Sequence, residues 1–294
     1  MTSKLNGQLG VLGTAVLQQT PHAAFDKSLL SDHKSPSRAR DITTGPPTAF
    51  QFLGFGIVGA CQSAFEVGGD FYDVIRLADD SVLLVVADVM GKGLPASVFA
   101  SSLRTLVRAL AHPCVSPAHL LSELNDLMFE QLSSADIFIT AQLVLADLRQ
   151  RHLSIASAGH CPLLMSNGTH RACALAPDGM PLGIQKHSVF FEHLAPLEPF
   201  GSVLLYTDGL TEARDSSGDF FGQSRLETWF TANVRDGATA AQIKKGLLDE
   251  LRSFQAGKRP VDDQTFLVLS DETPRTGALN LAQHVQVDVA LLAA

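Results

Sequence analysis

Aspartates at the ends of apolar runs are the feature that most constrains how this chain can fold. Residues 81–87 and 202–206 are apolar runs that lead into an aspartate, and residues 265–269 form a run that follows one. Short apolar runs of this kind are typical of buried β-strands. A carboxylate at a strand end is held by a stiff element and still reaches solvent.

Four short acidic motifs contain these aspartates. They are EVGGDFYD at residues 66–73, ADVMGKG at 87–93, YTDG at 206–209 and DDQT at 262–265. Carboxylates brought together repel unless cations lie between them, and such oxygen-rich sites suit Mg²⁺ or Mn²⁺. Two such ions can generate a hydroxide and bind a phosphoryl group. The alternative for any single motif is a turn or a cap, because Asp bonds to nearby backbone and Gly adopts positive φ.

The composition predicts a well-packed acidic protein. The 294 residues allow one large domain or two small ones, and an apolar content of 46% supports a sizeable core. Charged residues make up 18%, below the usual level of roughly 25%. The net charge of −8 argues against nucleic acid as a partner, since proteins that bind it carry basic patches.

The cysteine pattern and the lengths of the apolar runs indicate the cellular compartment. None of the four cysteines forms a C-x-x-C pair, which argues against a zinc site and favours reduced, core-type residues. The sequence shows no apolar stretch of about 20 residues and no signal peptide. We therefore expect a cytoplasmic protein without a membrane-spanning segment.

Three regions are expected along the chain. Residues 1–48 form a linker-like N-terminal extension that is partly flexible, in which the apolar residues 11–17 are either a packing helix or part of the tail. Residues 49–271 form the main domain. Residues 272–294 form a tail, in which 285–292 is apolar enough for an added strand or helix.

The main domain is expected to be α+β, with antiparallel sheets packed together and helices outside. Ser116 is expected to cap a helix that begins at Pro117, and Thr239 with Gln242 fits a capping box. Period and composition predict a strand-rich segment at 50–60, strands at 73–77, 81–87, 137–146, 152–157, 188–193, 203–206 and 265–269, and helices at 94–112, from 116, at 222–233 and at 239–256.

The combination and order of the motifs identify a family resemblance. The ordered set is GDFYD at 69–73, DVMGKG at 88–93, AGH at 158–160, LYTDGLTEA at 205–213 and DDQT at 262–265. Over about residues 50 to 270 the chain resembles the metal-dependent (PPM-type) serine/threonine protein phosphatases, in the bacterial SpoIIE/RsbU branch. The resemblance implies a four-layer αββα sandwich with two Mn²⁺ or Mg²⁺ ions at one edge between the sheets.

The resemblance also implies a role for each acidic residue. Asp88 matches the aspartate that bridges both metals, and the carbonyl of Val89 is a further ligand. Asp208 matches the aspartate that holds one metal, and Asp70 contacts metal directly or through water. The implied catalytic residues are Asp70, Asp88, Asp208 and Asp262, and the implied metal ligands are these four with Val89 and Asp263, of which Asp263 either assists or caps.

Three other polar residues have two interpretations each. Asp73 is a ligand candidate that more often would hold the following turn. Lys92 could attract phosphate, or it could simply lie between glycines that start a helix. His160 is a candidate acid or ligand because histidine titrates near neutral pH, and it is equally a candidate structural residue.

The implied function is hydrolysis of phosphoserine or phosphothreonine on a regulatory protein by attack of a metal-bridging hydroxide. In this branch the substrate is typically an anti-sigma-factor antagonist. An activator protein or a self-associating N-terminal segment would bias the segments 66–73 and 88–112, and a homodimer is a further candidate partner. The alternatives are a non-catalytic regulatory module of the same fold and a broader phosphohydrolase. The arginine that many eukaryotic relatives place near the first motif has no obvious equivalent here.

Overall fold

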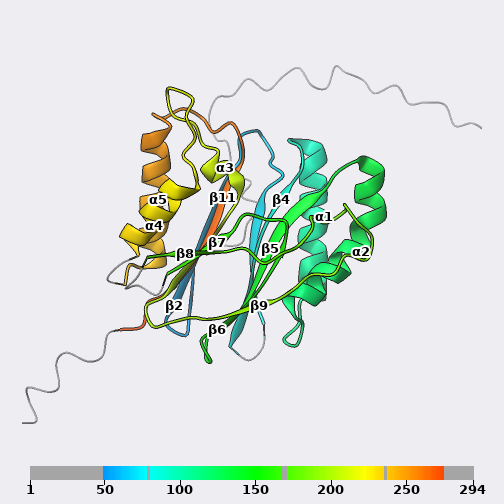
Figure 1. The fold of residues 1–294 in the computed structure, drawn as a ribbon, viewed down its shortest axis with the longest axis horizontal. Helices are drawn as coiled ribbons and strands as arrows, with labels where there is room; N and C mark the ends of the chain where they lie inside the picture. Colours follow the sequence, from blue (N-terminus) through cyan, green and yellow to red (C-terminus); the bar gives the residue numbers. More distant parts are fainter. Residues whose placement is uncertain (1–48, 78–79, 167–170, 235–236, 275–294) are drawn as a thin grey trace, which may run out of the picture. The chain divides into compact units, whose positions relative to one another are not determined.

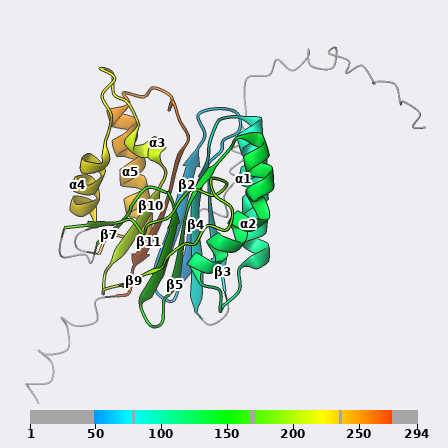
Figure 2. The ribbon, with the colours of Figure 1, turned by 45° about the vertical axis from the view of Figure 1, so that its right-hand side comes forward.

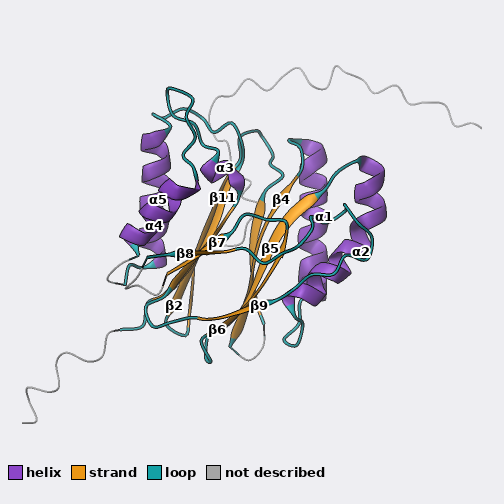
Figure 3. Ribbon diagram, in the orientation of Figure 1, coloured by secondary structure: helices purple, strands orange, loops and turns teal. Residues whose placement is uncertain are grey.

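The computed structural model describes residues 49–77, 80–166, 171–234 and 237–274. Two antiparallel sheets lie face to face between two layers of helices, as Figure 1 and the colouring by secondary structure in Figure 3 show. This arrangement confirms the expected α+β sandwich. The expectations for residues 1–48 and for 285–292 lie outside the described residues.

The first sheet contains the first two acidic motifs. Its strands, in spatial order, are β3 (Phe71–Arg76), β4 (Ser81–Val89), β5 (Ile139–Asp147), β6 (His152–Ala158) and β9 (His193–Pro196). Helices α1 (Leu94–Leu110) and α2 (Pro117–Ala135) cover its outer face, and Figure 2 shows both helices in front of it.

The second sheet contains the last two motifs. Its strands, in spatial order, are β1 (Ala49–Phe52), β2 (Phe55–Gln62), β11 (Gln264–Asp271), β10 (Ser202–Tyr206), β7 (Leu163–Ser166) and β8 (Cys173–Leu175). Helices α4 (Gln223–Asn233) and α5 (Ala240–Phe254) cover its outer face, and the short helix α3 (Asp208–Thr211) follows β10. In the described part of the chain, each helix is too short or too polar to cross a membrane.

Strand alternation divides the apolar residues between the layers. On β4, Leu83 and Val85 pack against α1 and α2, whereas Val82, Leu84 and Val86 pack between the sheets. Because successive side chains of a strand point to opposite faces, both faces of this strand are buried. The uninterrupted apolar run in the sequence is the direct result.

The expected helix starts are present. Ser116 Oγ accepts a hydrogen bond from His119 N at 3.1 Å, with Pro117 in the first turn. Thr239 and Gln242 form the reciprocal capping box at the start of α5. Each of these caps satisfies amide groups that a helix start leaves without an intrahelical partner.

One strand prediction needs correction, and the strand-rich segment at 50–60 is confirmed. The expected strand at 188–193 is wrong, because β9 begins only at His193. The segment before β9 is bonded to helix α2. The backbone of His187 donates to Asp126 on α2 at 3.1 Å, and Ser188 Oγ donates to the Gln185 carbonyl at 2.8 Å. The apolar segment 50–60 is a hairpin, since Leu53 and Gly54 turn the chain at φ 53° and 82°.

Asp73 does not hold a turn. Its side chain is fully buried on β3 and accepts hydrogen bonds from Arg108 Nε at 2.6 Å and Nη2 at 2.7 Å. Arg104 Nε donates to the same carboxylate at 3.0 Å. Both arginines lie on α1, so Asp73 anchors this helix to the strand that follows Asp70.

Candidate active site

The register of the two sheets brings the four motifs to one edge of the sandwich. In the first sheet Phe71 pairs with Ala87, so Asp70 before β3 lies opposite Asp88 near the end of β4. In the second sheet Tyr206 pairs with Phe266, so the end of β10 lies beside the start of β11. Asp88 lies on the same face of β4 as Val82, Leu84 and Val86, so its side chain points between the sheets.

Two glycines allow the backbones of different motifs to approach closely. A Cβ atom at Gly69 would lie 2.8 Å from the carbonyl oxygen of Val89, and one at Gly209 would collide with the carbonyl of Asp263. Neither glycine has positive φ. The Asp208–Gly209 pair therefore starts α3 and packs against the last motif, and it does not form the simple turn that Asp-Gly often indicates.

Thr207 orients Asp70 from the opposite sheet. Asp70 is buried, and Thr207 Oγ1 donates to its Oδ2 at 2.7 Å. The same hydroxyl accepts a hydrogen bond from Thr265 N at 3.2 Å, which fixes its direction. The sequence analysis missed Thr207, although its place between a buried strand and Asp208 was a usable signal.

Asp263 holds the loop of the first motif. Its Oδ1 accepts from Ala64 N at 2.8 Å, and its Oδ2 accepts from Gly69 N at 2.8 Å and from Asp70 N at 3.4 Å. A Cβ at Gly68 would collide with this carboxylate. The structure thus gives Asp263 the capping interactions, and its expected contact with a metal stays a prediction.

Lys92 extends over the entrance to the acidic cluster. Its Nζ lies 3.0 Å from Asp262 Oδ2 and donates to the Val261 carbonyl at 2.9 Å. The flanking glycines Gly91 and Gly93 have φ of 99° and 72°, and Gly93 is the N-cap of α1. The structural interpretation of these glycines is confirmed, and Lys92 still reaches the acidic residues.

The carboxylates perturb one another strongly. Burial, and then the charge of Asp208, raise the pKa of Asp88 to about 7. Burial, and then the charge of Asp88, raise the pKa of Asp70 well above its usual range. Burial, followed by the charge of Glu212, raises the pKa of Asp208 as well.

His160 joins the two sheets below this cluster. The buried ring bonds through Nε2 to the carbonyl oxygen of Tyr206 at 3.0 Å and through Nδ1 to Thr140 Oγ1 at 2.8 Å. Because a carbonyl only accepts, Nε2 carries the proton and Nδ1 accepts from the Thr140 hydroxyl. Burial lowers the pKa of His160 to about 4. The ring is therefore neutral, and the structural interpretation of His160 is the one that the geometry favours.

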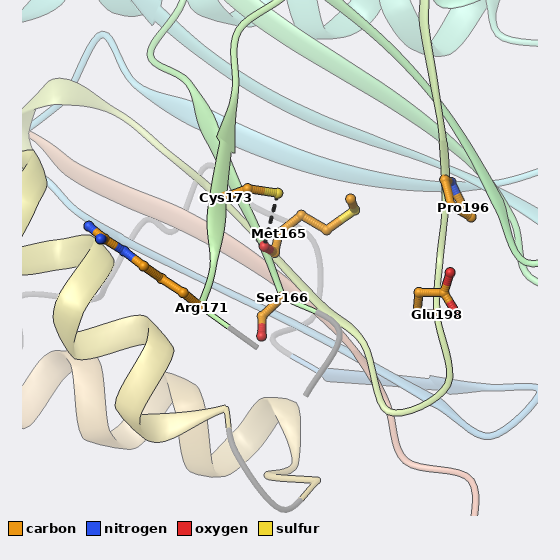
Figure 4. A pocket seen from close by; sticks show the side chains of 6 residues that line it. All are labelled: Met165, Ser166, Arg171, Cys173, Pro196 and Glu198. Atoms are coloured by element: carbon orange, nitrogen blue, oxygen red, sulfur yellow. Dashed lines mark hydrogen bonds between the residues drawn. The ribbon is translucent and has the colours of Figure 1, made fainter. Parts of the chain in front are cut away.

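Two other features lack the chemistry of a catalytic centre. Burial raises the pKa of the Cys161 thiol, which lies near Asp208, to about 12, so the thiol is a poor nucleophile. A small pocket is lined by residues of the β7–β8 hairpin and of the segment around β9, and none of the expected site residues lines it. In Figure 4 the Arg171 guanidinium points away from Glu198 in this pocket.

Comparison with known proteins places the chain in a family. A family model for stage II sporulation protein E (SpoIIE) matches residues 78–271. The chain belongs to the SpoIIE family. SpoIIE-family phosphatases of the RsbU type are PPM-type enzymes, so the resemblance inferred from the motifs is confirmed.

Individual relatives agree with this assignment. The chain is 28% identical over 207 residues to phosphoserine phosphatase RsbU of Bacillus subtilis, covering 70% of this chain and 60% of that protein. It is 26% identical over 234 residues to protein IcfG of Synechocystis, covering 71% of this chain and 36% of that protein. The chain therefore spans less than two thirds of the length of either relative.

A solved structure shows the same fold. The PP2C domain of SiaA from Pseudomonas aeruginosa superposes with a TM-score of 0.63 at 26% identity, covering 73% of this chain and 85% of that one. This similarity supports the four-layer sandwich and the assignment to the SpoIIE family.

The donor set of this SpoIIE-family site fits hard divalent cations. The candidate donors are all oxygens, namely the carboxylates of Asp70, Asp88, Asp208 and Asp262 and the carbonyl of Val89. Among the described residues, no three acidic, His or Cys side chains already converge as a metal-holding group. Burial and neighbouring negative charges raise the pKa values of Asp70, Asp88 and Asp208, and a bound cation would stabilise the charged forms of these carboxylates.

The raised pKa of Asp88 predicts a pH-dependent stability difference between wild type and Asp88→Asn. In EDTA the folded wild type keeps the Asp88 proton up to about pH 7, whereas the unfolded chain loses it near pH 3.9. Wild type therefore loses free energy of unfolding as pH rises through this window, and the variant does not. We expect Asp88→Asn to gain in Tm relative to wild type between about pH 5 and pH 8.

Differential scanning calorimetry across this range measures the difference. Asp249→Asn is the matched control, because Asp249 is exposed and its lysine partner lowers its pKa. The Tm difference between this control and wild type should stay constant above about pH 5. A constant difference for Asp88→Asn as well would contradict the prediction.

Proposed function

We propose that the chain is a metal-dependent protein phosphatase that hydrolyses phosphoserine or phosphothreonine on a regulatory protein. The observation that carries the proposal is the register of the two sheets, which places Asp70 opposite Asp88 and the end of β10 beside the start of β11, while burial and neighbouring charges raise the pKa values of Asp70, Asp88 and Asp208. Such a centre has few uses other than to hold cations. The phosphatase domain would comprise residues 49–271.

Each residue of the site would have a defined task. Asp88, the Val89 carbonyl, Asp70, Asp208 and Asp262 would hold two Mn²⁺ or Mg²⁺ ions, and Asp263 would assist from the capped loop. When bound, the ions supply an activated water and neutralise charge on the phosphoryl oxygens. Thr207 keeps Asp70 in position through its 2.7 Å hydrogen bond.

Lys92 is the candidate group for attracting phosphate. Its ammonium group lies 3.0 Å from Asp262 Oδ2 and compensates the charge of that carboxylate. If a metal ion bound Asp262, the Lys92 ammonium group would lose this partner. It would then be free to contact the phosphate of an incoming substrate. This would offer one cation where the sequence lacks the arginine of many eukaryotic relatives.

The substrate class follows from the family. The relatives named phosphoserine phosphatases support a phosphoserine protein as substrate. Within this branch we propose an anti-sigma-factor antagonist as the regulatory protein, with an activator protein or a second copy of the chain as a further partner. The non-catalytic alternative is disfavoured because every expected aspartate is retained.

A substrate panel tests the proposal. We expect kcat/KM for a phosphoserine protein, isolated from a strain that lacks this gene, to exceed that for p-nitrophenyl phosphate by about 100-fold or more. Phosphate release in Mn²⁺ is the measurement, and Asp208→Asn is the inactive control. Equal values across small phosphoesters would favour the broader phosphohydrolase, and no hydrolysis of any substrate would favour the regulatory module.

A further inference from the structure

Large exposed apolar side chains lie on the segments that carry the acidic residues of the candidate site. Phe65, Met90, Leu94 and Val261, called here the apolar rim, expose 56%, 38%, 69% and 61% of their surface. Phe65 precedes the first motif, Met90 and Leu94 follow Asp88, and Val261 precedes Asp262. The rim is therefore built from segments that also carry the acidic residues.

Lys92 shows that these segments meet at one place. Its Nζ lies 5.8 Å from the centre of the Phe65 ring and 2.9 Å from the carbonyl oxygen of Val261. Met90 and Leu94 are each two residues from Lys92 in the chain. The same Nζ contacts Asp262 at 3.0 Å, so the rim borders the acidic cluster directly.

The rim does not contribute to the core. The buried clusters between the layers contain none of its members. Single exposed apolar residues are common on protein surfaces, whereas a group of them at the entrance of a site indicates a binding surface. Burying one such side chain against a ligand is worth about 1.5 kcal/mol or more.

The rim is held in place before any ligand arrives. Ala64 N donates to Asp263 Oδ1 at 2.8 Å, which fixes the backbone beside Phe65. Leu94 is the first residue of α1, and the Val261 carbonyl is bound by Lys92. A surface that is already ordered loses little conformational entropy on binding, so its apolar area is available for affinity.

The charge around the rim restricts the kind of ligand. The rim borders the carboxylate of Asp262, and the whole chain carries a net charge of −8. The net negative charge disfavours a peptide with acidic side chains beside its phosphoryl group, and the exposed apolar residues of the rim favour apolar side chains there. Affinity beyond the phosphoryl group therefore has to come from apolar contacts.

We propose that the apolar rim is the docking surface for the substrate segment on either side of the phosphorylated residue, and that this segment carries apolar side chains. This inference rests on the proposed phosphatase function and adds a preference for apolar flanking residues. A second copy of the chain or a separate activator at the rim are the competing occupants.

Two phosphoserine peptides that differ only in flanking residues test the preference. One carries Leu and Val beside the phosphoserine, the other Asp and Glu, and p-nitrophenyl phosphate serves as a substrate without flanks. We expect wild-type protein in Mn²⁺ to favour the apolar peptide by about 10-fold or more in kcat/KM. An equal rate for both peptides, or a preference for the acidic one, overturns the proposal.

Rim variants locate the preference on the protein. Phe65→Ser, Leu94→Ser and Val261→Ser should each lower kcat/KM for the apolar peptide by about 10-fold, mainly through KM, and leave p-nitrophenyl phosphate within about twofold. Val189→Ser and Leu194→Ser are matched controls, because both side chains are 70% exposed and lie outside the rim. The controls should change neither substrate.

The remaining outcomes are distinguishable. Equal losses for the peptide and for p-nitrophenyl phosphate in variants with unchanged Tm would overturn the docking role. If the rim variants kept wild-type peptide kinetics but differed from wild type in the mass measured by sedimentation, the rim would be the binding surface for a second copy of the chain. If wild type hydrolyses none of the three substrates, the proposed function itself fails, which is a different result from a loss of peptide preference.

Discussion

Chelation with EDTA is expected to abolish hydrolysis of p-nitrophenyl phosphate and of phosphoserine peptides, and excess Mn²⁺ or Mg²⁺ to restore it. The physical reason is the acidic cluster, in which burial and then the charge of Asp208 raise the pKa of Asp88 to about 7. Without cations these groups retain protons or repel one another, so they cannot bind a dianionic phosphate. The measurement is phosphate release before chelation, after it and after metal addition.

Matched chelator controls sharpen this experiment. EDTA already saturated with Mg²⁺, added to protein assayed in Mg²⁺, should have no effect, because it cannot withdraw further metal. Calorimetric titration of the metal-free protein with Mn²⁺ should show two ions bound per chain if the proposed site is complete. Full activity in excess free EDTA would refute the metal-dependent mechanism.

Asp88→Asn and Asp208→Asn are each expected to lower kcat by about 100-fold or more, an effect comparable to the loss of a key electrostatic group in other enzymes. The amide removes the charge of a proposed ligand while keeping its size. The fold should persist, because each aspartate lies at a strand end and its side chain is only half-buried. Steady-state kinetics in Mn²⁺ and calorimetric metal titration measure the two consequences separately.

The double variant and one surface variant complete this test. Both aspartates would serve one centre, so the combined loss should be much smaller than the product of the single losses. Asp249→Asn, an exposed change on α5, should leave kcat unchanged. If either single variant keeps more than about a tenth of wild-type kcat, a loss under ~1.4 kcal/mol, its role as a ligand is wrong.

Local pattern was sufficient for the elements that carry the site. The apolar runs at β4, β10 and β11 are buried on both faces, so their composition identifies them without any knowledge of partners. The caps at Ser116 and Thr239 are likewise local, since a side chain bonds to an amide three residues later. The antiparallel arrangement followed from the order of strands and helices.

Interactions between distant segments could not be predicted in the same way. Asp73 binds Arg104 and Arg108, which are separated from it by a strand and a loop, and nothing near Asp73 indicates these partners. The hydrogen bonds from backbone amides to the Asp263 carboxylate join distant segments. Gly69, for example, lies 194 positions before Asp263 in the sequence. The short strands β7 and β8 lack a distinctive period because their partners define them.

The hydrogen bonds of His160 make the framework of the site independent of the protonation of its carboxylates. A ring that donates to Tyr206 and accepts from Thr140 keeps one tautomer, and its pKa of about 4 leaves it neutral throughout the neutral range. The distance between the two sheets at this point is thus insensitive to pH, whereas Asp88 gains and loses a proton near pH 7. At low pH, protons would then compete with metal ions for the same carboxylate oxygens, while the hydrogen bonds of His160 persist. Activity lost on acidification would therefore return at neutral pH without refolding.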